Sequence, residues 1–168
     1  MKNLLFITLS FLYSNFIYAQ YSSIEHNNET RQYIYYEPEN LQKNAPLVFV
    51  MHGYSSDASV IKNYSNMNTI ANENGFAVCY PRGTEDDYGN RFWNVGYDFH
   101  PDETVDDVDF LVQLVDYLQN KHDLSNENIF ATGMSNGGEM CYMLACEAST
   151  TFKAVTSVAG MMLQDIMD

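Results

Sequence analysis

One segment of the chain has the residue pattern that surrounds a nucleophilic serine. Residues 133–137 read Gly-Met-Ser-Asn-Gly, so Ser135 stands at the centre of a G-x-S-x-G spacing. An apolar run precedes this segment, and apolar residues at helical spacing follow it. A serine at a tight strand-to-helix turn has strained backbone angles and needs small residues two positions away on each side. We therefore predict that Ser135 is a catalytic nucleophile. The alternative is a glycine-rich turn that contains an incidental serine.

A second segment is suited to stabilise negative charge on a reacting carbonyl. His52-Gly53-Tyr54 follows the apolar run from Leu47 to Met51. Acyl transfer needs backbone N–H groups directed at the developing oxyanion, one of them from the residue after the nucleophile. We predict that the backbone N–H groups of Tyr54 and Asn136 are these donors. His52 precedes the serine in the chain, and we expect it to pack the loop and not to act as the base.

Strand and helix patterns alternate along the chain and must position these two segments. Strands are expected at 32–36, 47–51, 76–80, 129–133 and 154–159, and helices at 57–74, 108–118 and 137–148. Gly75 is a plausible helix C-cap, and Thr104 with Asp107 is typical of a capping box. Continuous apolar strands are typical of a parallel sheet covered on both sides. The fold class is therefore α/β, a mostly parallel sheet with helices on both faces. Residues 81–103 lack periodicity, and we expect a long loop that is either functional or disordered.

The first nineteen residues differ from the rest of the chain. Lys2 is followed by an apolar stretch and then by Ala19, which is the layout of a secretory signal peptide. We expect cleavage after Ala19, a secreted or periplasmic protein, and one domain over 20–168; the alternative is a buried or membrane-spanning N-terminal helix. The formal net charge of −14 disfavours nucleic acid and anionic membrane surfaces as partners.

The sequence predicts no cofactor and no metal. The three cysteines do not have the spacing of a zinc site. We expect Cys79 to be a buried thiol, and Cys141 and Cys146 to diverge on one helix and not to bridge. A group of acids is compatible with a calcium site, although acids are also favoured at helix starts. These acids are Asp98, Asp102, Glu103, Asp106, Asp107 and Asp109.

Six segments between about Arg31 and Gly160 match one group of proteins in unbroken order. They are Phe76 to Thr84, Trp93 to Gly96, Val105 to Val108, Ala131 to Gly138, Leu144 to Glu147 and Phe152 to Gly160. On these residues the chain resembles the polyhydroxybutyrate depolymerase, feruloyl esterase and acetylxylan esterase group of extracellular α/β-hydrolases. The resemblance implies a serine esterase acting on acyl esters of polysaccharides or polyesters. It makes Trp93 either a substrate-binding wall of the cleft or an anchor of the loop in the core.

The chain departs from that group after Gly160. In this fold the catalytic acid and histidine follow the serine, but the sequence has no histidine after Ser135. We therefore expect an α/β-hydrolase fold that is incomplete at the C-terminus. The strand over 154–159 then becomes an exposed sheet edge, and Cys146 loses a disulfide partner.

Two other functions remain open at this stage. One is a serine peptidase of the prolyl oligopeptidase type, which shares the serine turn. The other is a non-catalytic remnant that binds carbohydrate or lipid. A panel of ester and amide substrates distinguishes the peptidase from an esterase. Reaction with a fluorophosphonate distinguishes an esterase from the non-catalytic remnant, which would not react.

The 168-residue chain by itself should be nearly inactive as an esterase. Loss of a triad histidine costs on the order of a million-fold in turnover. A burst of p-nitrophenol release by residues 1–168, abolished by Ser135→Ala, would contradict this expectation.

Overall fold

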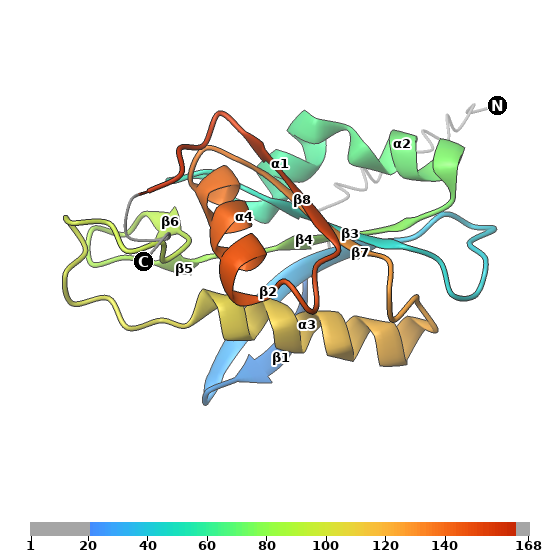
Figure 1. The fold of residues 1–168 in the computed structure, drawn as a ribbon, viewed down its shortest axis with the longest axis horizontal. Coiled ribbons are helices and arrows are strands. Elements are labelled where there is room, and N and C mark those ends of the chain that lie inside the picture. The colour runs from blue at the N-terminus through green and yellow to red at the C-terminus, as the bar shows by residue number, and fades with distance from the viewer. Residues whose placement is uncertain (1–20, 164–168) are drawn as a thin grey trace, which may run out of the picture.

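The computed structural model describes residues 21–163, which form a six-stranded sheet flanked by helices and a small two-stranded sheet (Figure 1). The large sheet has the order β1-β2-β4-β3-β7-β8. Its strands are β1 (Ser22–His26), β2 (Glu29–Tyr36), β3 (Leu47–Met51), β4 (Ala77–Pro81), β7 (Ile129–Met134) and β8 (Ala154–Val158). The small sheet pairs β5 (Thr84–Glu85) with β6 (Arg91–Phe92). The helices are α1 (Ala58–Ser65), α2 (Met67–Asn74), α3 (Asp107–His122) and α4 (Asn136–Glu147).

The sheet is mostly parallel, as the apolar strands predict. β4, β3, β7 and β8 are parallel to one another, while β2 pairs antiparallel with both β4 and β1. The carboxyl ends of the parallel strands point to the side where β5, β6 and the loop before α3 lie (Figure 1). The register pairs Met51 with Gly133, so the segments after β3 and β7 begin side by side at this edge.

Apolar side chains on both faces of the sheet form two separate core layers. Alternate residues of a strand point to opposite faces. Phe49 and Cys79 pack in the layer under α3 and α4, and Val50 and Val78 pack in the layer under α1 and α2. Cys79 is completely buried, which confirms its prediction as a core thiol.

The structure corrects two predicted helix boundaries. The single helix expected over 57–74 is two helices, because Asn66 takes a left-handed conformation (φ 51°) that ends α1 and precedes α2. Helix α3 is capped by Asp106, whose carboxylate accepts the N–H of Asp109 at 2.9 Å, and Thr104 lies outside the helix. Gly75 is confirmed as a C-cap with φ 73°.

Three strands were not predicted from the sequence. β1 alternates but holds only one aliphatic residue, Ile24, so its apolar pattern is weak. β5 and β6 are two residues each and lie inside the predicted loop 81–103. They close a short hairpin that fixes part of this loop against the large sheet.

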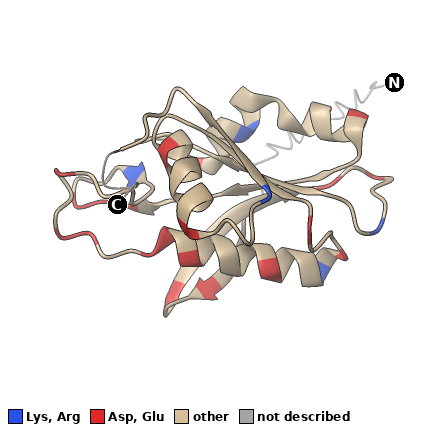
Figure 2. Cartoon of the chain, in the orientation of Figure 1, with Lys and Arg blue, Asp and Glu red and all other residues tan. Residues whose placement is uncertain are grey.

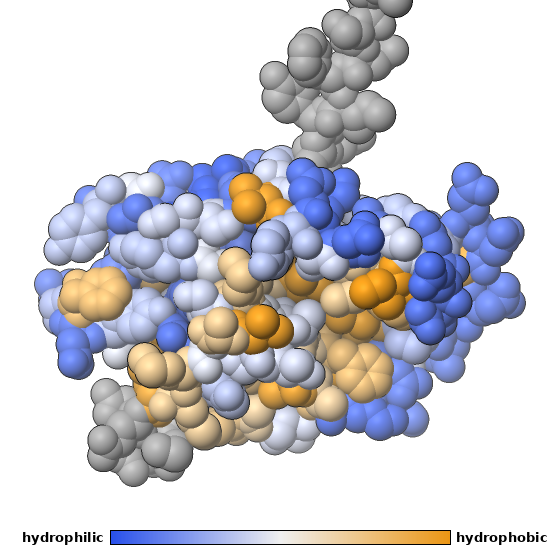
Figure 3. Space-filling view, turned by 90° about the horizontal axis from the view of Figure 1, so that it is seen from above, coloured by the Kyte–Doolittle hydropathy of each residue, from blue (hydrophilic) through white to orange (hydrophobic). Residues whose placement is uncertain are grey.

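Among the described residues β8 is the edge of the sheet, as expected. Helix α4 packs on one face of β8, but Ala154, Thr156 and Val158 on the other face are exposed. The exposed apolar surface continues into Met161 and Met162. Seen from above, the molecule presents several hydrophobic side chains on this face (Figure 3).

Acidic residues outnumber basic ones over much of the molecule. Asp and Glu lie on α3, on α4 and along the loop that precedes α3 (Figure 2). Within residues 21–163, no helix is both long and apolar enough to cross a membrane. The predicted signal peptide, residues 1–19, lies outside the described residues.

A buried ion pair joins β2 to the start of α3. Arg31 Nη2 lies 2.6 Å from Asp107 Oδ1, and both side chains are almost completely buried. The guanidinium also lies over the Phe110 ring, 3.8 Å from its centroid. The second carboxylate oxygen of Asp107 accepts the backbone N–H of Asn94 at 2.8 Å. The pair therefore fixes the long loop as well as the helix.

Asp107→Ala should destabilise the fold strongly. The substitution leaves Arg31 charged and buried without a partner, which costs about 3–5 kcal/mol in free energy of unfolding. Lys43→Ala is the control, because Lys43 pairs with Asp123 at an exposed site and should change stability little. Urea unfolding of both variants measures the difference. Equal stability of the two variants would contradict the role of the pair.

Candidate active site

Ser135 occupies a strained turn between β7 and α4. Its backbone angles are φ 54° and ψ −121°, a region that L-residues with a side chain rarely adopt. The N–H of Ser135 donates to the carbonyl of Val158 at 2.8 Å, and its own carbonyl accepts the N–H of Gly138 at 2.7 Å. The residue is exposed, whereas Asn136 next to it is buried. The hydroxyl therefore does not belong to the core.

The two glycines that flank the serine are required by close backbone contacts. A Cβ at Gly133 would lie 2.2 Å from the carbonyl oxygen of Gly137. A Cβ at Gly137 would lie 2.5 Å from the carbonyl oxygen of His52. The start of α4 therefore rests directly on the end of β3, and no side chain fits between them.

The 52–55 loop lies beside the serine. A Cβ built on Gly53 would be 3.4 Å from Ser135 Cβ and 4.0 Å from Ser135 Oγ. Among the hydrogen bonds of residues 21–163, neither the N–H of Tyr54 nor that of Asn136 has an acceptor. The two groups predicted as oxyanion donors are thus in segments that meet at the serine, and both are free to donate.

His52 packs the loop, as its position in the chain predicts. Its Nε2 accepts the N–H of Gly83 at 3.0 Å, so the ring proton is on Nδ1, which donates to the carbonyl of Gly53 at 2.8 Å. Burial lowers the pKa of His52 to about 4, despite the opposing hydrogen bond to Gly53. A neutral ring with both nitrogens engaged cannot serve as a general base for Ser135.

Trp93 lies in the core of this structure. Its side chain is completely buried, and its indole N–H donates to the carbonyl of His52 at 2.9 Å. The Asn136 amide clamps the Trp93 backbone, accepting its N–H at 2.7 Å and donating to its carbonyl at 3.0 Å. In this structure Trp93 anchors the loop in the core, which favours the second of its two interpretations, and the substrate-binding role of Trp93 stays a prediction.

A cluster of aromatic residues near the nucleophile was missed from the sequence. Tyr97 and Phe99 stack with ring centroids 4.7 Å apart, and Tyr54 meets both rings edge to face. The Tyr97 hydroxyl accepts from Asn136 Nδ2 at 3.1 Å and donates to Glu139 in the first turn of α4. Phe99 is 54% exposed, so this cluster presents an apolar surface next to the serine. The signal in the sequence was the density of aromatic residues between 88 and 99.

All four histidines of the chain have other partners. His26 bonds to Asp109, His100 to Asp86, and His122 stacks on the Tyr35 ring, while His52 is engaged as described. Within the described part of the chain, no side chain hydrogen-bonds to the Ser135 hydroxyl. The base that would activate Ser135 is not found among these histidines.

Three of the acidic residues between 98 and 109 have structural roles. Asp106 caps α3, Asp107 pairs with Arg31, and Asp109 bonds to His26. From residue 21 to residue 163, no group of three or more His, Cys, Asp or Glu residues could hold a metal ion. Cys141 is buried and Cys146 exposed, and both are free thiols, so the prediction that they do not bridge is confirmed.

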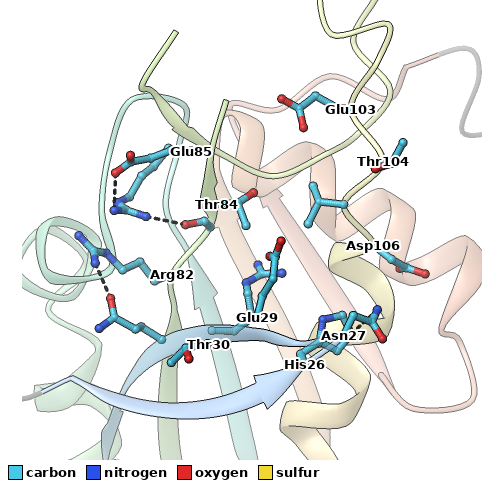
Figure 4. A pocket seen from close by; sticks show the side chains of 15 residues that line it. His26, Asn27, Glu29, Thr30, Arg82, Thr84, Glu85, Glu103, Thr104 and Asp106 are labelled. Carbon is cyan, nitrogen blue, oxygen red and sulfur yellow. Dashed lines mark hydrogen bonds and ion pairs between the residues drawn. The ribbon is translucent and has the colours of Figure 1, made fainter. Parts of the chain in front are cut away.

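Two polar cavities lie at this edge of the molecule, and neither is lined by Ser135. The cavity of about 620 Å³ opens between the β1–β2 turn, the segment after β4 and the residues before α3. Figure 4 shows Glu29, Arg82, Glu85 and Asp106 around it. Neither Ser135 nor any residue of the 52–55 loop lines this cavity, so it is not the place where Ser135 would attack a substrate.

Comparison with known proteins now identifies the family. The model of the esterase PHB depolymerase family matches residues 31–167. The chain belongs to this family. Poly(3-hydroxyalkanoate) depolymerase C of Paucimonas lemoignei is 26% identical over 152 residues, which cover 88% of this chain and 36% of that protein. Feruloyl esterase B of Thermothelomyces thermophilus is 26% identical over 139 residues, covering 80% of this chain and 46% of that protein.

The solved structures agree on the fold. The acetyl xylan esterase of Aspergillus awamori superposes with a TM-score of 0.68 at 20% identity, covering 84% of this chain and 52% of that one. This confirms the α/β-hydrolase fold predicted from the sequence. The chain spans only between 17% and 48% of the length of the curated relatives it matches.

The ionisation of His52 should make stability fall in mildly acidic solution. Its pKa is about 4 in the folded protein and about 6.5 in the unfolded chain, so the unfolded chain takes up the proton first. Its contribution is fully present above pH 6.5 and is lost as the pH falls towards 4. His52→Gln should flatten the pH dependence of the unfolding free energy in this window by up to about 1.4 kcal/mol per pH unit. A His52 ring resonance that titrates near 6.5 in NMR spectra would contradict the assignment.

Proposed function

We propose that this protein is a serine ester hydrolase with Ser135 as its nucleophile. One observation carries the proposal: an exposed serine in a strained turn at the start of a helix, beside a loop in which the N–H of Tyr54 has no acceptor among the described residues. This is the arrangement that acyl transfer in the α/β-hydrolase fold requires. Membership of the esterase PHB depolymerase family supports the same reaction class.

The reaction would begin with attack of Ser135 Oγ on the ester carbonyl. The carbonyl oxygen becomes an oxyanion, which accepts hydrogen bonds from the N–H groups of Tyr54 and Asn136. The positive end of the α4 dipole, which starts at Asn136, favours the same charge. Collapse of this intermediate releases the alcohol and leaves an acyl group on Ser135, which water then removes.

A general base is needed for both steps, because a serine hydroxyl is a weak nucleophile at neutral pH. In this fold the acid and the histidine follow the serine along the chain. The 168 residues contain no histidine after position 135. The proposal concerns the whole protein, because the chain spans less than half of the length of the curated relatives reported above, and assays use the protein expressed from its complete reading frame.

The substrate class we propose is an acyl ester attached to a polysaccharide or a polyester. The names of similar proteins support it: a poly(3-hydroxyalkanoate) depolymerase, a feruloyl esterase and an acetyl xylan esterase. Insoluble polymers of this kind are met outside the cell. The signal-like residues 1–19 support export of a mature chain from Gln20.

Ser135→Ala should abolish ester hydrolysis by the protein from the complete reading frame. The expected loss of kcat for p-nitrophenyl acetate is on the order of a million-fold, as for removal of other serine nucleophiles. A fluorophosphonate probe should label the wild-type protein at Ser135 and leave the variant unlabelled. Ser157→Ala is a control on the neighbouring strand. The Ser157 hydroxyl is buried and should not react with the probe, so this variant should be labelled like the wild type.

Three results would contradict the proposal. A wild-type protein that neither hydrolyses esters nor reacts with the probe would favour a non-catalytic binding protein. Cleavage of peptide amides faster than of the matching esters would favour a peptidase. Activity that survives in Ser135→Ala would place the nucleophile elsewhere.

A further inference from the structure

Asp86 is a buried carboxylate that the reaction outlined above does not use. It lies in the hairpin between β5 and β6, and its side chain has no exposed surface. Four groups donate to it: the Tyr54 hydroxyl, the N–H groups of Tyr88 and Asn90 at 2.9 and 2.8 Å, and His100 Nε2 at 3.0 Å. Burial raises the pKa of Asp86, but the hydrogen bonds from Tyr54, Asn90 and Tyr88 outweigh it and hold the pKa at about 2.

The two oxygens of this carboxylate have different partners. Oδ1 accepts only the N–H groups of Tyr88 and Asn90, so it closes the local turn of the hairpin. Oδ2 accepts from Tyr54 and His100, which are 32 and 14 residues away in the sequence. A turn would be complete with Oδ1 alone. The bond from Tyr54 to Oδ2 ties the hairpin to the 52–55 loop, and the bond from His100 ties it to the segment before α3.

Further hydrogen bonds hold the same loop to the hairpin. The Tyr54 hydroxyl accepts from Asn90 Nδ2 at 3.2 Å, and Ser55 Oγ donates to Asn90 Oδ1 at 2.8 Å. The N–H of Ser55 donates to the carbonyl of Arg91 at 2.8 Å. Ser55 has φ 56°, a conformation that costs energy in a residue with a side chain and persists only when neighbouring groups enforce it. The backbone at Tyr54 is thus held by the hydrogen bonds of the Tyr54 hydroxyl and by those of Ser55, the following residue.

The loop is held from its other end by the core. His52 bonds to Gly53 and Gly83, and the His52 carbonyl accepts from the Trp93 indole. Tyr54 is therefore the point in the loop where the outer hairpin, and not the core, determines the position of the backbone. Displacement of a catalytic group by about 1 Å can cost a hundred-fold in rate.

We propose that Asp86 is a positioning residue for the oxyanion hole: through Oδ2 and the Tyr54 hydroxyl it fixes the backbone N–H of Tyr54 beside Ser135. The inference rests on the proposed function. It adds that a carboxylate in the distant hairpin sets the geometry of one oxyanion donor.

Tyr54→Phe isolates this link, because it removes only the hydroxyl and keeps the backbone N–H. Tyr88→Phe is the matched control: Tyr88 lies in the same hairpin and is 73% exposed, its hydroxyl has no hydrogen bond among the described residues, and the variant keeps the backbone N–H that donates to Asp86. Asp86→Asn is the second variant, since one amide oxygen can still accept the N–H groups of the turn. All are made in the protein from the complete reading frame.

The assay measures kcat and KM for p-nitrophenyl acetate at a temperature where every variant is folded by circular dichroism. Tyr54→Phe and Asp86→Asn should lower kcat on the order of ten- to a hundred-fold, less than the hundred- to thousand-fold lost when an oxyanion donor is removed. KM should stay within about two-fold, because the oxyanion forms only after binding. Tyr88→Phe should match the wild type.

A second measurement separates positioning from folding. Phenylboronic acid forms a tetrahedral adduct with a reactive serine, so its inhibition constant should rise in Tyr54→Phe in proportion to the loss of kcat. Unchanged kcat in Tyr54→Phe, a loss matched by Tyr88→Phe, or a loss equal to the unfolded fraction would each overturn the inference. If the wild type shows no Ser135-dependent hydrolysis, the proposed function itself has failed.

Discussion

Helix α4 begins so close to the end of β3 that a methyl group at position 137 would overlap the carbonyl oxygens of Met51 and His52, 2.6 and 2.5 Å away. This contact brings together the two segments on which the proposed chemistry depends. It forces Ser135 into a left-handed turn and places it against Gly53. The strain of that turn is held by the bond from the Ser135 N–H to Val158 and by the first bonds of α4. A change at this contact would separate the nucleophile from its oxyanion donors.

Around this contact, hydrogen bonds between buried polar groups fix the positions of the loops. His52, Trp93 and Asn136 form a continuous set of hydrogen bonds from the end of β3 to the start of α4. Each group is nearly or completely buried, and each makes at least one hydrogen bond to a backbone atom of another segment. A buried polar network of this kind specifies one arrangement, because any other would leave polar groups unpaired.

Two buried carboxylates organise the long segment between β4 and α3. Asp107 holds the Asn94 backbone and pairs with Arg31, while Asp86 collects donors from Tyr54, His100 and its own turn. The segment that lacked any periodicity is therefore ordered by charge and hydrogen bonding and not by an apolar stripe. The chain can bury these two carboxylates at the edge of its sheet because each of them accepts at least two hydrogen bonds.

The sequence by itself determined the fold class, the serine turn and the position of the 52–55 loop. Continuous apolar strands and helical spacing are local properties, and the two glycines around Ser135 show where the backbone must come close. Only the tertiary structure decided the roles of Trp93, Asp86 and Tyr97. The long-range partners that define these roles are 14 or more residues away, so no spacing pattern records them, and burial of a tryptophan or a tyrosine depends on which loop folds over it. The break at Asn66 and the cap at Asp106 are local features, but the spacing of apolar residues does not mark them.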